Sequence, residues 1–460
     1  MKTKNSIGIV FFLFIVVLLL LNSPMLAQAS QRPNIVLIIS DDQSWTDYGF
    51  MGHETIQTPH LDKLGTQGAM FRRGYVPTAL CRPSLMTLAC GYYAHQNRTT
   101  GNDPAATEAN RRHAAAAGKT DRELLISHVD RVATLPKILG KLGYLSHQSG
   151  KWWEGSYQRG GFTHGMTRGY PEHKGRHGDD GLKIGREGMA PVFDFIDMAL
   201  DQEKPFFLWY APFLPHTPHN PPERIVKKYR KEGRTEPVAK YYAMCEWFDE
   251  TCGQLLGRLD EKGLSDNTLV VYVTDNGWIQ LPRANGYAPH SKRSPYEGGI
   301  RTPIMFRWPG VIAPTERPEL CSSIDIVPTI LGAAGAEVPA DLLGLNLLPA
   351  LRDDKIIDRD TIFGEAFAHD IADIETPEAS LVFRWVIEGD WKLLLTYDGR
   401  LGRMKYPPTD AAPQLFNLKA DPDEKTNLAD RKPQRVKRLS EKIENWWPVT
   451  ERKQGVANRR

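Results

Sequence analysis

The sequence predicts an α/β fold with a large, mostly parallel central sheet flanked by helices and a smaller C-terminal α+β domain. Three continuous apolar runs, rich in β-branched or aromatic residues, support the sheet, because a strand covered on both faces needs such a run. Segments with helical patterns separate these runs, as parallel strands require crossover connections. After about residue 350 the pattern changes to alternating segments. The three buried strands are expected at 32–40, 205–210 and 268–273.

Helices and shorter strands fill the chain between these runs. Pro59 and Pro83 favour helix starts, because proline pre-sets the first helical turn and lacks only an N–H that would be unpaired there. Gly143 marks a helix end, since glycine readily takes the left-handed conformation that closes a helix. We expect helices at 58–64 (capped by Thr58), 84–88, 134–142, 189–200, 240–262 and 323–333, and strands at 144–149 and 303–307.

The C-terminal part of the chain is organised differently. Residues 351–360 are charged and resemble a linker. Segments 382–387 and 391–396 alternate around a Gly-Asp pair in the manner of a β-hairpin, and a final helix is expected over 433–446. We therefore divide the chain into a leader at 1–29, a main domain at 30–355 and a C-terminal α+β subdomain at 356–460.

The leader has the features of a secretory signal peptide. Lys2 and Lys4 precede an apolar run from Ile7 to Leu21, and Ala27-Gln28-Ala29 is a small-x-small cleavage site. This arrangement is typical of a cleaved leader rather than of a spanning helix. Because no cysteine follows the run closely, a lipid anchor is not expected. We predict cleavage near Ala29 and a periplasmic or secreted mature protein without a stable membrane span.

Charge and cysteine content exclude two classes of protein. The 460-residue chain has a formal net charge of +3, which falls to +1 when Lys2 and Lys4 leave with the leader. This balance lacks the basic footprint of a nucleic-acid-binding protein. Five cysteines in an exported chain of this size do not make a disulfide framework. Cys245 and Cys252, seven residues apart on one predicted helix, would be about 10 Å apart, too far for a bridge.

Because the number of cysteines is odd, at least one stays outside any internal pairing, and we expect this to be Cys81. The segment 77–87 places it at the start of a predicted helix, where free N–H groups and the helix dipole favour an anion. A side chain there can attack or hold a negatively charged group. A buried structural cysteine explains the same pattern, and the segment alone does not separate the two interpretations.

A pair of polar side chains follows each predicted buried strand. The site of an open α/β sheet lies outside the carboxyl ends of its strands, so these groups can converge. Carboxylate and amide oxygens suit Ca²⁺ or Mg²⁺, and several carboxylates together repel without a cation. Taken singly, Asp-Asn-Gly is a common turn, Asp-Asp often caps a helix, and the histidines also fit a weak zinc motif or an ordinary loop. The pairs are Asp41 and Asp42, His216 and His219, and Asp275 and Asn276.

Six short motifs occur in order along the chain. They are Asp-Asp at 41–42, Cys-x-Pro-Ser at 81–84, Gly-Lys-Trp at 150–152, His-x-Pro-His at 216–219, Asp-Asn-Gly at 275–277 and Lys…Tyr-Glu-Gly-Gly-x-Arg at 292–301. Together they resemble the formylglycine-dependent (type I) sulfatases of the alkaline-phosphatase superfamily, over nearly the whole mature chain. The resemblance implies an alkaline-phosphatase-like fold and hydrolysis of a sulfate ester on a sulfated carbohydrate.

The resemblance also implies roles for single residues. Cys81 matches the cysteine that a maturation enzyme oxidises to formylglycine; one hydroxyl of its hydrate attacks sulfur, and the other then expels sulfate. The usual ion is one Ca²⁺, which acidifies the hydrate and neutralises sulfate oxygens. The implied residues are Asp41, Asp42, Cys81, Asp275 and Asn276 for the metal, Lys151 and Lys292 for the sulfate, and His219 for the leaving-group oxygen, with His216 as the less favoured choice.

Two positions depart from the family pattern. The usual motif is Cys-x-Pro-x-Arg, but position 85 is leucine. That arginine belongs to the maturation signal and supports the formylglycine. Trp153 replaces a histidine that normally contacts the hydrate. Arg82 is one source of the missing charge, and we expect an atypical member of the family.

Other functions stay open at this point. Phosphate and sulfate esters share tetrahedral geometry, so a phosphodiesterase or phosphonate monoester hydrolase fits the same residues. A non-catalytic glycan-binding homologue with unmodified Cys81 is a further alternative. Segments 96–128 and 159–186 either bind a sulfated glycan at a rim or are solvated loops. The rim residues would be Arg159, His164, Arg168, His173, Lys174, Arg176 and His177, with Trp152, Trp153 or Tyr157 stacking on sugars.

Overall fold

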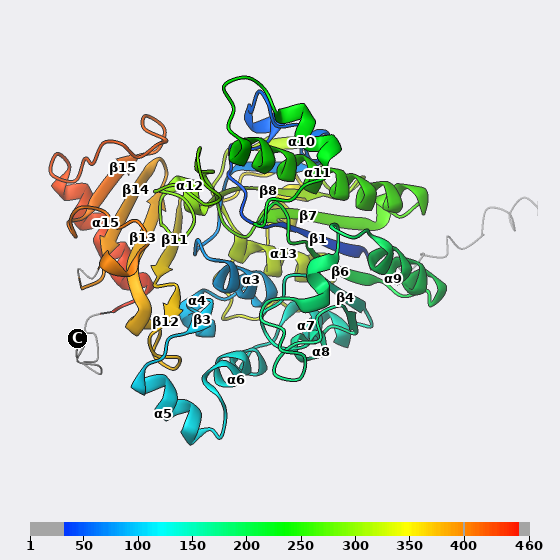
Figure 1. The fold of residues 1–460 in the computed structure, drawn as a ribbon, viewed down its shortest axis with the longest axis horizontal. Coiled ribbons are helices and arrows are strands. Elements are labelled where there is room, and N and C mark those ends of the chain that lie inside the picture. Colours follow the sequence, from blue (N-terminus) through cyan, green and yellow to red (C-terminus); the bar gives the residue numbers. More distant parts are fainter. Residues whose placement is uncertain (1–31, 399–400, 450–460) are drawn as a thin grey trace, which may run out of the picture. The chain divides into compact units, whose positions relative to one another are not determined.

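The computed structural model describes residues 32–398 and 401–449, and the predicted leader at 1–29 lies outside them. Residues from Pro33 onward form one unit by their contacts. Within its described part lies a nine-stranded sheet, ordered β10-β2-β8-β7-β1-β6-β4-β5 with β9 beside β2 (Figure 1). The strands are β1 (Asn34–Ser40), β2 (Ala69–Tyr75), β4 (Leu145–Gly150), β5 (His164–Gly165), β6 (Phe206–Ala211), β7 (Thr268–Thr274), β8 (Arg301–Arg307), β9 (Thr315–Arg317) and β10 (Cys321–Ser322).

The sheet is mostly parallel, as predicted. β1 pairs in parallel with β6 and β7, and β4 pairs in parallel with β6. Only β8 runs antiparallel to its neighbours among these described strands, β2 on one side and β7 on the other. The three predicted buried strands are therefore adjacent, in the order β7-β1-β6, and their carboxyl ends share one edge of the sheet.

Helices cover both faces of the sheet, which is why β1 is apolar throughout. Ile35, Leu37 and Ile39 pack with α3, α7 and α13 on one face, and Val36 and Ile38 pack with α2, α9 and α11 on the other. No helix in the described part of the chain is long and apolar enough to cross a bilayer. The helices are α2 (Pro59–Thr66), α3 (Cys81–Cys90), α4 (Ala94–Asn97), α5 (Glu108–Ala116), α6 (Asp121–Ile126), α7 (Leu135–Lys141), α8 (Tyr157–Gly160), α9 (Ala190–Asp201), α10 (Glu223–Tyr229), α11 (Glu236–Glu261), α12 (Glu297–Ile300), α13 (Ile326–Ala333), α14 (Leu348–Arg352) and α15 (Pro433–Trp446).

The starts of two helices differ in detail from the prediction. α3 begins at Cys81, so Pro83 is its third residue rather than its first. Proline fits there because the first N–H groups of a helix have no acceptor within it. Thr58 stands at the N-cap of α2. Its hydroxyl, however, accepts from the Gly49 N–H and donates to Asp62 instead of capping the helix.

A second, antiparallel sheet forms the C-terminal part, in the order β11-β13-β14-β15. Its central hairpin and α15 confirm the predicted hairpin and final helix. Phe383 and Trp385 join the core on the α3 side of the main sheet, while the other face packs on α15 through Leu439 and Ile443. The predicted boundary at 355/356 falls between α14 and β11. The strands are β11 (Thr361–Phe367), β13 (Leu381–Glu388), β14 (Trp391–Thr396) and β15 (Gln414–Asn417), and β3 (Asp103–Pro104) pairs separately with β12 (Asp370–Ile371).

Candidate active site

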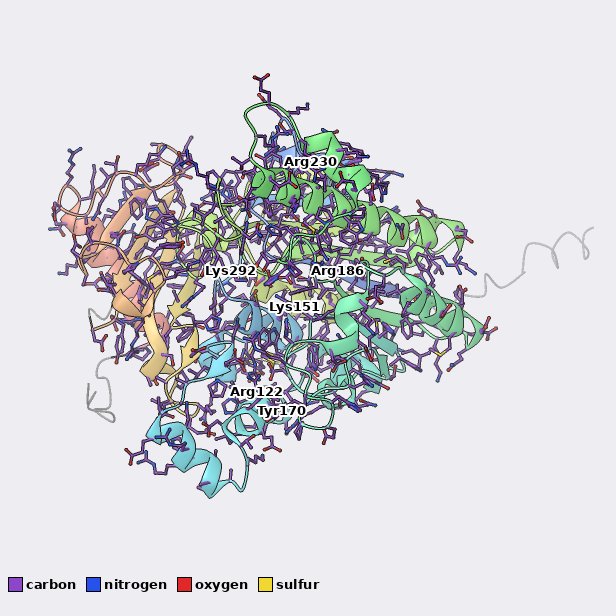
Figure 2. All side chains as sticks on the ribbon, viewed as in Figure 1. Arg122, Lys151, Tyr170, Arg186, Arg230 and Lys292 are labelled. Carbon is purple, nitrogen blue, oxygen red and sulfur yellow. The ribbon has the colours of Figure 1, made fainter. Side chains whose placement is uncertain are left out.

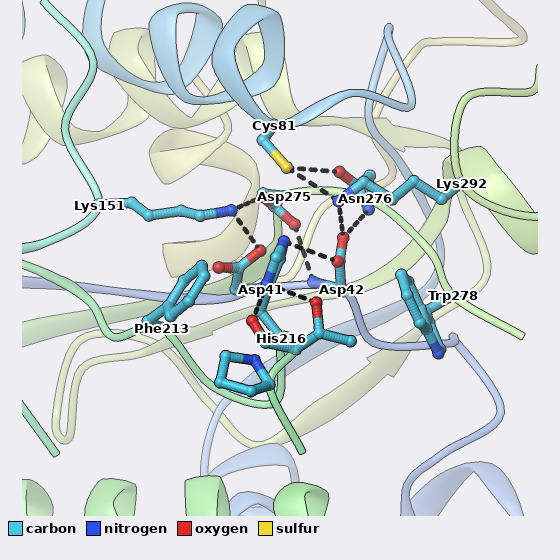
Figure 3. Close-up of polar contacts among 12 residues, drawn as sticks. Asp41, Asp42, Cys81, Lys151, Phe213, His216, Asp275, Asn276, Trp278 and Lys292 are labelled. Atoms are coloured by element: carbon cyan, nitrogen blue, oxygen red, sulfur yellow. Dashed lines mark hydrogen bonds and ion pairs between the residues drawn. The ribbon is translucent and has the colours of Figure 1, made fainter. Parts of the chain in front are cut away.

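The order of the strands brings the predicted side chains together. Adjacent strands β7, β1, β6 and β4 end next to one another, and each is followed by a polar side chain that points into one cluster (Figure 3). α3 adds its first residue, and the loop between β7 and α12 adds a lysine. Figure 2 shows both lysines near the middle of the fold, beside α3. The cluster contains Asp41, Asp42, Cys81, Lys151, His216, Asp275, Asn276 and Lys292.

Cys81 lies fully buried against this cluster. Its Sγ is 3.1 Å from Lys292 Nζ and 3.5 Å from Asn276 Oδ1. Burial raises the pKa of the Cys81 thiol to about 12, although Lys151 and Lys292 act in the opposite direction. The thiol is therefore protonated at neutral pH, and since the thiolate is the nucleophilic form, unmodified Cys81 is a weak nucleophile.

The acidic residues offer oxygen ligands to a cation. Donor atoms of Asp41, Asp42, Cys81 and His216 all lie within 4.8 Å of one another. Asp275 is next to this group, because its Oδ1 accepts the Asp42 N–H at 3.1 Å. The second oxygens of Asp41 and Asp275 are buried without a hydrogen-bond partner among the described residues. Buried oxygens without partners, supplied mainly by carboxylates, fit a hard divalent ion such as Ca²⁺.

Asn276 tightens the same cluster. Its Nδ2 donates to Asp42 Oδ1 at 2.7 Å, while its Oδ1 faces Cys81. Asp42 itself has a left-handed backbone with φ of 65°. Aspartate tolerates this conformation better than most residues, and such backbones gather at functional sites. The turn after β1 thus directs Asp41 and Asp42 into one small volume.

Two buried lysines neutralise part of this charge. Lys151 Nζ lies 2.7 Å from Asp41 Oδ1 and 4.0 Å from Asp275 Oδ2. Lys292 Nζ lies 2.5 Å from Asp42 Oδ1. Burial, with the neighbouring carboxylates, raises the pKa of Asp41 above its usual value. Burial also works against ionisation of Asp42, but Lys292 and then His216 hold its pKa at about 2.

The two predicted histidines occupy different places. His216 Nε2 lies 3.2 Å from Asp42 Oδ2, and Phe213 stacks on the ring with centroids 4.3 Å apart. His219 instead packs against the rings of Tyr241 and Trp278, at 5.4 and 6.0 Å between centroids. The geometry therefore favours His216 for contact with a substrate, whereas the family resemblance favoured His219.

A pocket of about 200 Å³ opens above the cluster. Its lining contains four cationic side chains and no acidic one. Of the predicted rim and stacking residues, Arg176, His177 and Trp153 line it, while Trp152 is buried in the core against Phe162 and Trp209. The lining residues are Cys81, Asn102, Lys151, Trp153, Arg176, His177, His216, Tyr287, Lys292, Arg293 and His369.

Four lining residues were not predicted: Asn102, Tyr287, Arg293 and His369. Arg293 directly follows Lys292, so its place beside a predicted site residue is the one local signal that could have indicated it. Asn102 and His369 lie far apart in the sequence and hydrogen-bond each other at 3.3 Å. Nothing in the sequence near either residue marks this contact.

The structure shows what surrounds Leu85, the first departure from the family pattern, and Arg82, the suggested source of the missing charge. Leu85 is buried in the core on the α3 side of the sheet. Arg82 donates to both carboxylate oxygens of Glu154, at 2.7 and 2.6 Å, and both side chains are buried. Its charge is thus already paired, and Arg82 is not among the residues that line the pocket.

Comparison with known proteins agrees with this geometry. The sulfatase family model matches residues 33–336, and a model of the C-terminal part of N-sulphoglucosamine sulphohydrolase matches residues 286–447. The chain is 30% identical over 373 residues to N-acetylgalactosamine-6-sulfatase of Canis lupus familiaris, covering 72% of this chain and 68% of that protein. It is 24% identical over 521 residues to N-acetylgalactosamine-6-O-sulfatase of Bacteroides thetaiotaomicron, with 91% and 94% covered.

The fold is also that of solved structures. The crystal structure of Ps i-CgsB in complex with k-i-k-neocarrahexaose superposes with a TM-score of 0.70, at 24% identity, over 91% of this chain and 93% of that chain. The family model covers well over half of the sequence, and its match begins at the first strand of the sheet that carries the cluster. The chain therefore belongs to the sulfatase family, as a hydrolase of sulfate esters with an alkaline-phosphatase-like fold.

Proposed function

We propose that this sulfatase is an exported enzyme that removes sulfate from a sulfated carbohydrate, with formylglycine at position 81 and one bound Ca²⁺. The observation that carries the proposal is the meeting of Cys81, two buried lysines and a carboxylate cluster below a pocket without acidic lining. The names of its relatives, which act on N-acetylgalactosamine sulfate, support a carbohydrate substrate. The sugar-bound structure of Ps i-CgsB supports the same class.

The charges of the site favour a substrate that is a singly charged ester. We call the charged residues concerned the inner cluster: Asp41, Asp42, Asp275, Lys151 and Lys292. Three carboxylates face two ammonium groups, which leaves one net negative charge. A divalent cation changes this to one positive charge. A sulfate monoester carries one negative charge and brings the site to neutrality, whereas a phosphate monoester dianion leaves one excess negative charge. Because unpaired buried charge is costly, the site favours the monoanion.

Several residues of this chain have separate roles in the proposed reaction. Lys151 and Lys292 bind sulfate oxygens and stabilise the charge that develops on them in the transition state. His216, held in place by Phe213, can transfer a proton at its Nε2 to or from the leaving-group oxygen. Asp41, Asp42, Asp275 and Asn276 would hold the cation, which when bound withdraws charge from the ester oxygens. Formylglycine, made by a maturation enzyme, would supply the attacking hydroxyl that the thiol lacks.

Mass spectrometry and kinetics of Cys81 variants test this proposal. Protein from a host that makes formylglycine should contain the aldehyde or its hydrate at position 81, and Cys81→Ala should abolish hydrolysis of sulfated sugars with the fold intact. Cys90→Ala is the matched control, because Cys90 is equally buried at the other end of α3 and lies outside the pocket. An intact thiol throughout, or full activity of Cys81→Ala, would contradict the proposal and favour a non-catalytic glycan-binding protein.

Phosphodiesters and phosphonate monoesters are also monoanions, so the charge balance alone does not separate them from sulfate esters. Turnover of aryl sulfate, phosphate diester and phosphate monoester by the same preparation decides between them. We expect the sulfate ester to have the highest kcat/KM and the phosphate monoester the lowest. A diester hydrolysed faster than any sulfate ester would assign the site to phosphoryl chemistry.

A further inference from the structure

Arg293 differs from the other cations of the pocket because no carboxylate forms an ion pair with it. Lys151 pairs with Asp41, Lys292 with Asp42, and Arg176 with Asp103. No carboxylate of the described residues lies within ion-pair distance of Arg293, and its buried Nε has no hydrogen-bond partner there. The guanidinium hydrogen-bonds the Tyr287 hydroxyl, which is neutral, so in a pocket without acidic lining this half-buried group keeps an uncompensated positive charge.

The backbone holds Arg293 in this position. Its φ is 67°, the left-handed region that residues with side chains rarely adopt. The Arg293 N–H donates to the Ala79 carbonyl at 2.8 Å, two residues before Cys81, so the loop is fixed to the start of α3. Strained conformations of this kind persist where the surroundings impose them, and they gather at ligand sites. Consecutive residues of one loop thereby place Lys292 against Cys81 and Arg293 on the pocket wall.

The ester itself does not need the charge of Arg293. With a divalent cation and one sulfate monoester, the inner cluster of Asp41, Asp42, Asp275, Lys151 and Lys292 is already neutral. A space of about 200 Å³ is about 7 Å across if spherical, so a group on the same sugar lies within reach of the wall. Charge-assisted hydrogen bonds from arginine to sulfate or carboxylate are strong and geometrically selective.

We infer that Arg293 forms a second anion-binding subsite, so that the preferred substrate is a sugar with a second sulfate or a carboxylate close to the ester that is cleaved. This inference rests on the proposed function and names its substrate class more narrowly. The second anion pairs with Arg293, while Lys151 and Lys292 hold the sulfate that leaves.

The test compares three sugars that share the cleaved sulfate: one with no other charge, one with a second sulfate and one with a carboxylate. Wild-type protein should have a higher kcat/KM for at least one doubly anionic sugar. In Arg293→Gln this preference should fall at least tenfold, because a charge-assisted contact becomes a neutral one. Arg293→Lys should keep part of it. Glutamine, like arginine, is strained at this φ, so the backbone conformation is not what the substitution changes.

Arg283→Gln is the matched control, since Arg283 belongs to the same loop but is exposed and does not line the pocket. The Arg283→Gln variant should show the same preference among the three sugars, measured as kcat/KM, as the wild type. An equal loss on all three sugars in Arg293→Gln would overturn the inference and assign Arg293 to the cleaved sulfate. A wild type that hydrolyses all three sugars with equal kcat/KM would also overturn it. Comparing the sulfate and carboxylate sugars shows which anion the subsite takes.

Calorimetric binding separates this inference from the proposed function. Cys81→Ala with and without Arg293→Gln is titrated with the same three sugars, so the result does not depend on turnover. If the wild type hydrolyses none of them, the proposed function fails, yet a tenfold loss of the binding preference in Arg293→Gln still supports the subsite. Equal binding of the singly and doubly anionic sugars by both proteins would refute the subsite.

Discussion

Among single residues, His216 lies where a proton can be exchanged with a departing oxygen, beside Asp42 and within the pocket. Substituting His216→Ala should lower kcat by roughly 10²–10⁴, the usual contribution of a positioned acid or base. The loss should be larger for sugar sulfates than for aryl sulfates, because a phenolate departs without help from an acid. Steady-state kinetics on both substrate types measure this difference.

His219→Ala is the matched control for that prediction. The His219 ring packs against Tyr241 and Trp278, outside the pocket lining. Its loss should therefore lower the free energy of unfolding, and it should lower kcat less than His216→Ala does. A larger loss of kcat in His219→Ala than in His216→Ala would reverse the assignment. Both variants keep the backbone of the same loop, so a difference between them reports on the ring positions alone.

The residues at the strand ends could be predicted because a simple rule connects them. Carboxyl ends of parallel strands meet at one edge, and Asp41, Asp275 and His216 each directly follow or lie shortly after an apolar run. Arg293, Asn102 and His369 follow no such rule. Their positions depend on a left-handed backbone and on the pairing of two short strands, β3 and β12, which no local periodicity indicates.

At the scale of elements, the contact between β13 and α15 is sensitive to pH. Glu388 accepts hydrogen bonds from Arg438 and Lys442, each at 2.7 Å, and these lower the pKa of Glu388 from 4.5 to about 2. A depressed pKa means that the unfolded chain binds more protons between pH 4.5 and 2. The pair therefore contributes stability above about pH 4.5, and this stability is lost as the pH falls through that window.

Substituting Glu388→Gln should remove this pH-dependent contribution. Because Arg438 is about half exposed, we expect solvent screening to limit the contribution to roughly 1 kcal/mol at neutral pH. Denaturant unfolding of parent and variant at pH 7, 4 and 3 measures this contribution. The difference between their free energies of unfolding should become smaller as the pH falls. Glu441→Gln, an exposed change on the same helix, should match the parent at every pH. A Glu388→Gln difference that stays constant with pH would refute the linkage.

The elements differ in how far their sequence defines them. α15 begins at Pro433, which pre-sets the first turn, and its predicted range agrees with the structure. β2 was not predicted, because Arg72 and Arg73 interrupt its apolar run at the partly exposed positions. α11 starts four residues before the predicted start at Lys240, with a proline in its first turn. Tertiary contacts, not periodicity, decide such ends.

For the molecule as a whole, the site lies at the edge of a sheet that is packed on both faces. The main sheet supplies four neighbouring strand ends, and the C-terminal sheet shares the core on the α3 side through Phe383 and Trp385. The sequence pattern was sufficient for the α/β class and the small second sheet. It did not define the strand order, because periodicity reports burial and not which strands are neighbours. That order became known only with the structure.

The carboxylate cluster should also determine how the whole fold responds to calcium. Burial and the neighbouring Asp42 raise the pKa of Asp275 despite Lys151, so the cluster without a cation is electrostatically crowded. Asp275→Asn removes one charge, while its amide oxygen can still accept the Asp42 N–H. In calcium-free buffer this variant should therefore unfold at the same temperature as the parent or a higher one.

Added calcium should make the parent more stable than the variant. At a free concentration of a hundred times Kd, binding to the native state alone stabilises the parent by about 2.7 kcal/mol, whereas the variant, lacking a ligand charge, should gain little. Thermal unfolding with chelator, Ca²⁺ or Mg²⁺ measures this shift. Asp201→Asn, an exposed change at the end of α9, should respond like the parent. If calcium stabilises Asp275→Asn as strongly as the parent, Asp275 is not a ligand, and the proposed ligand set reduces to Asp41, Asp42 and Asn276.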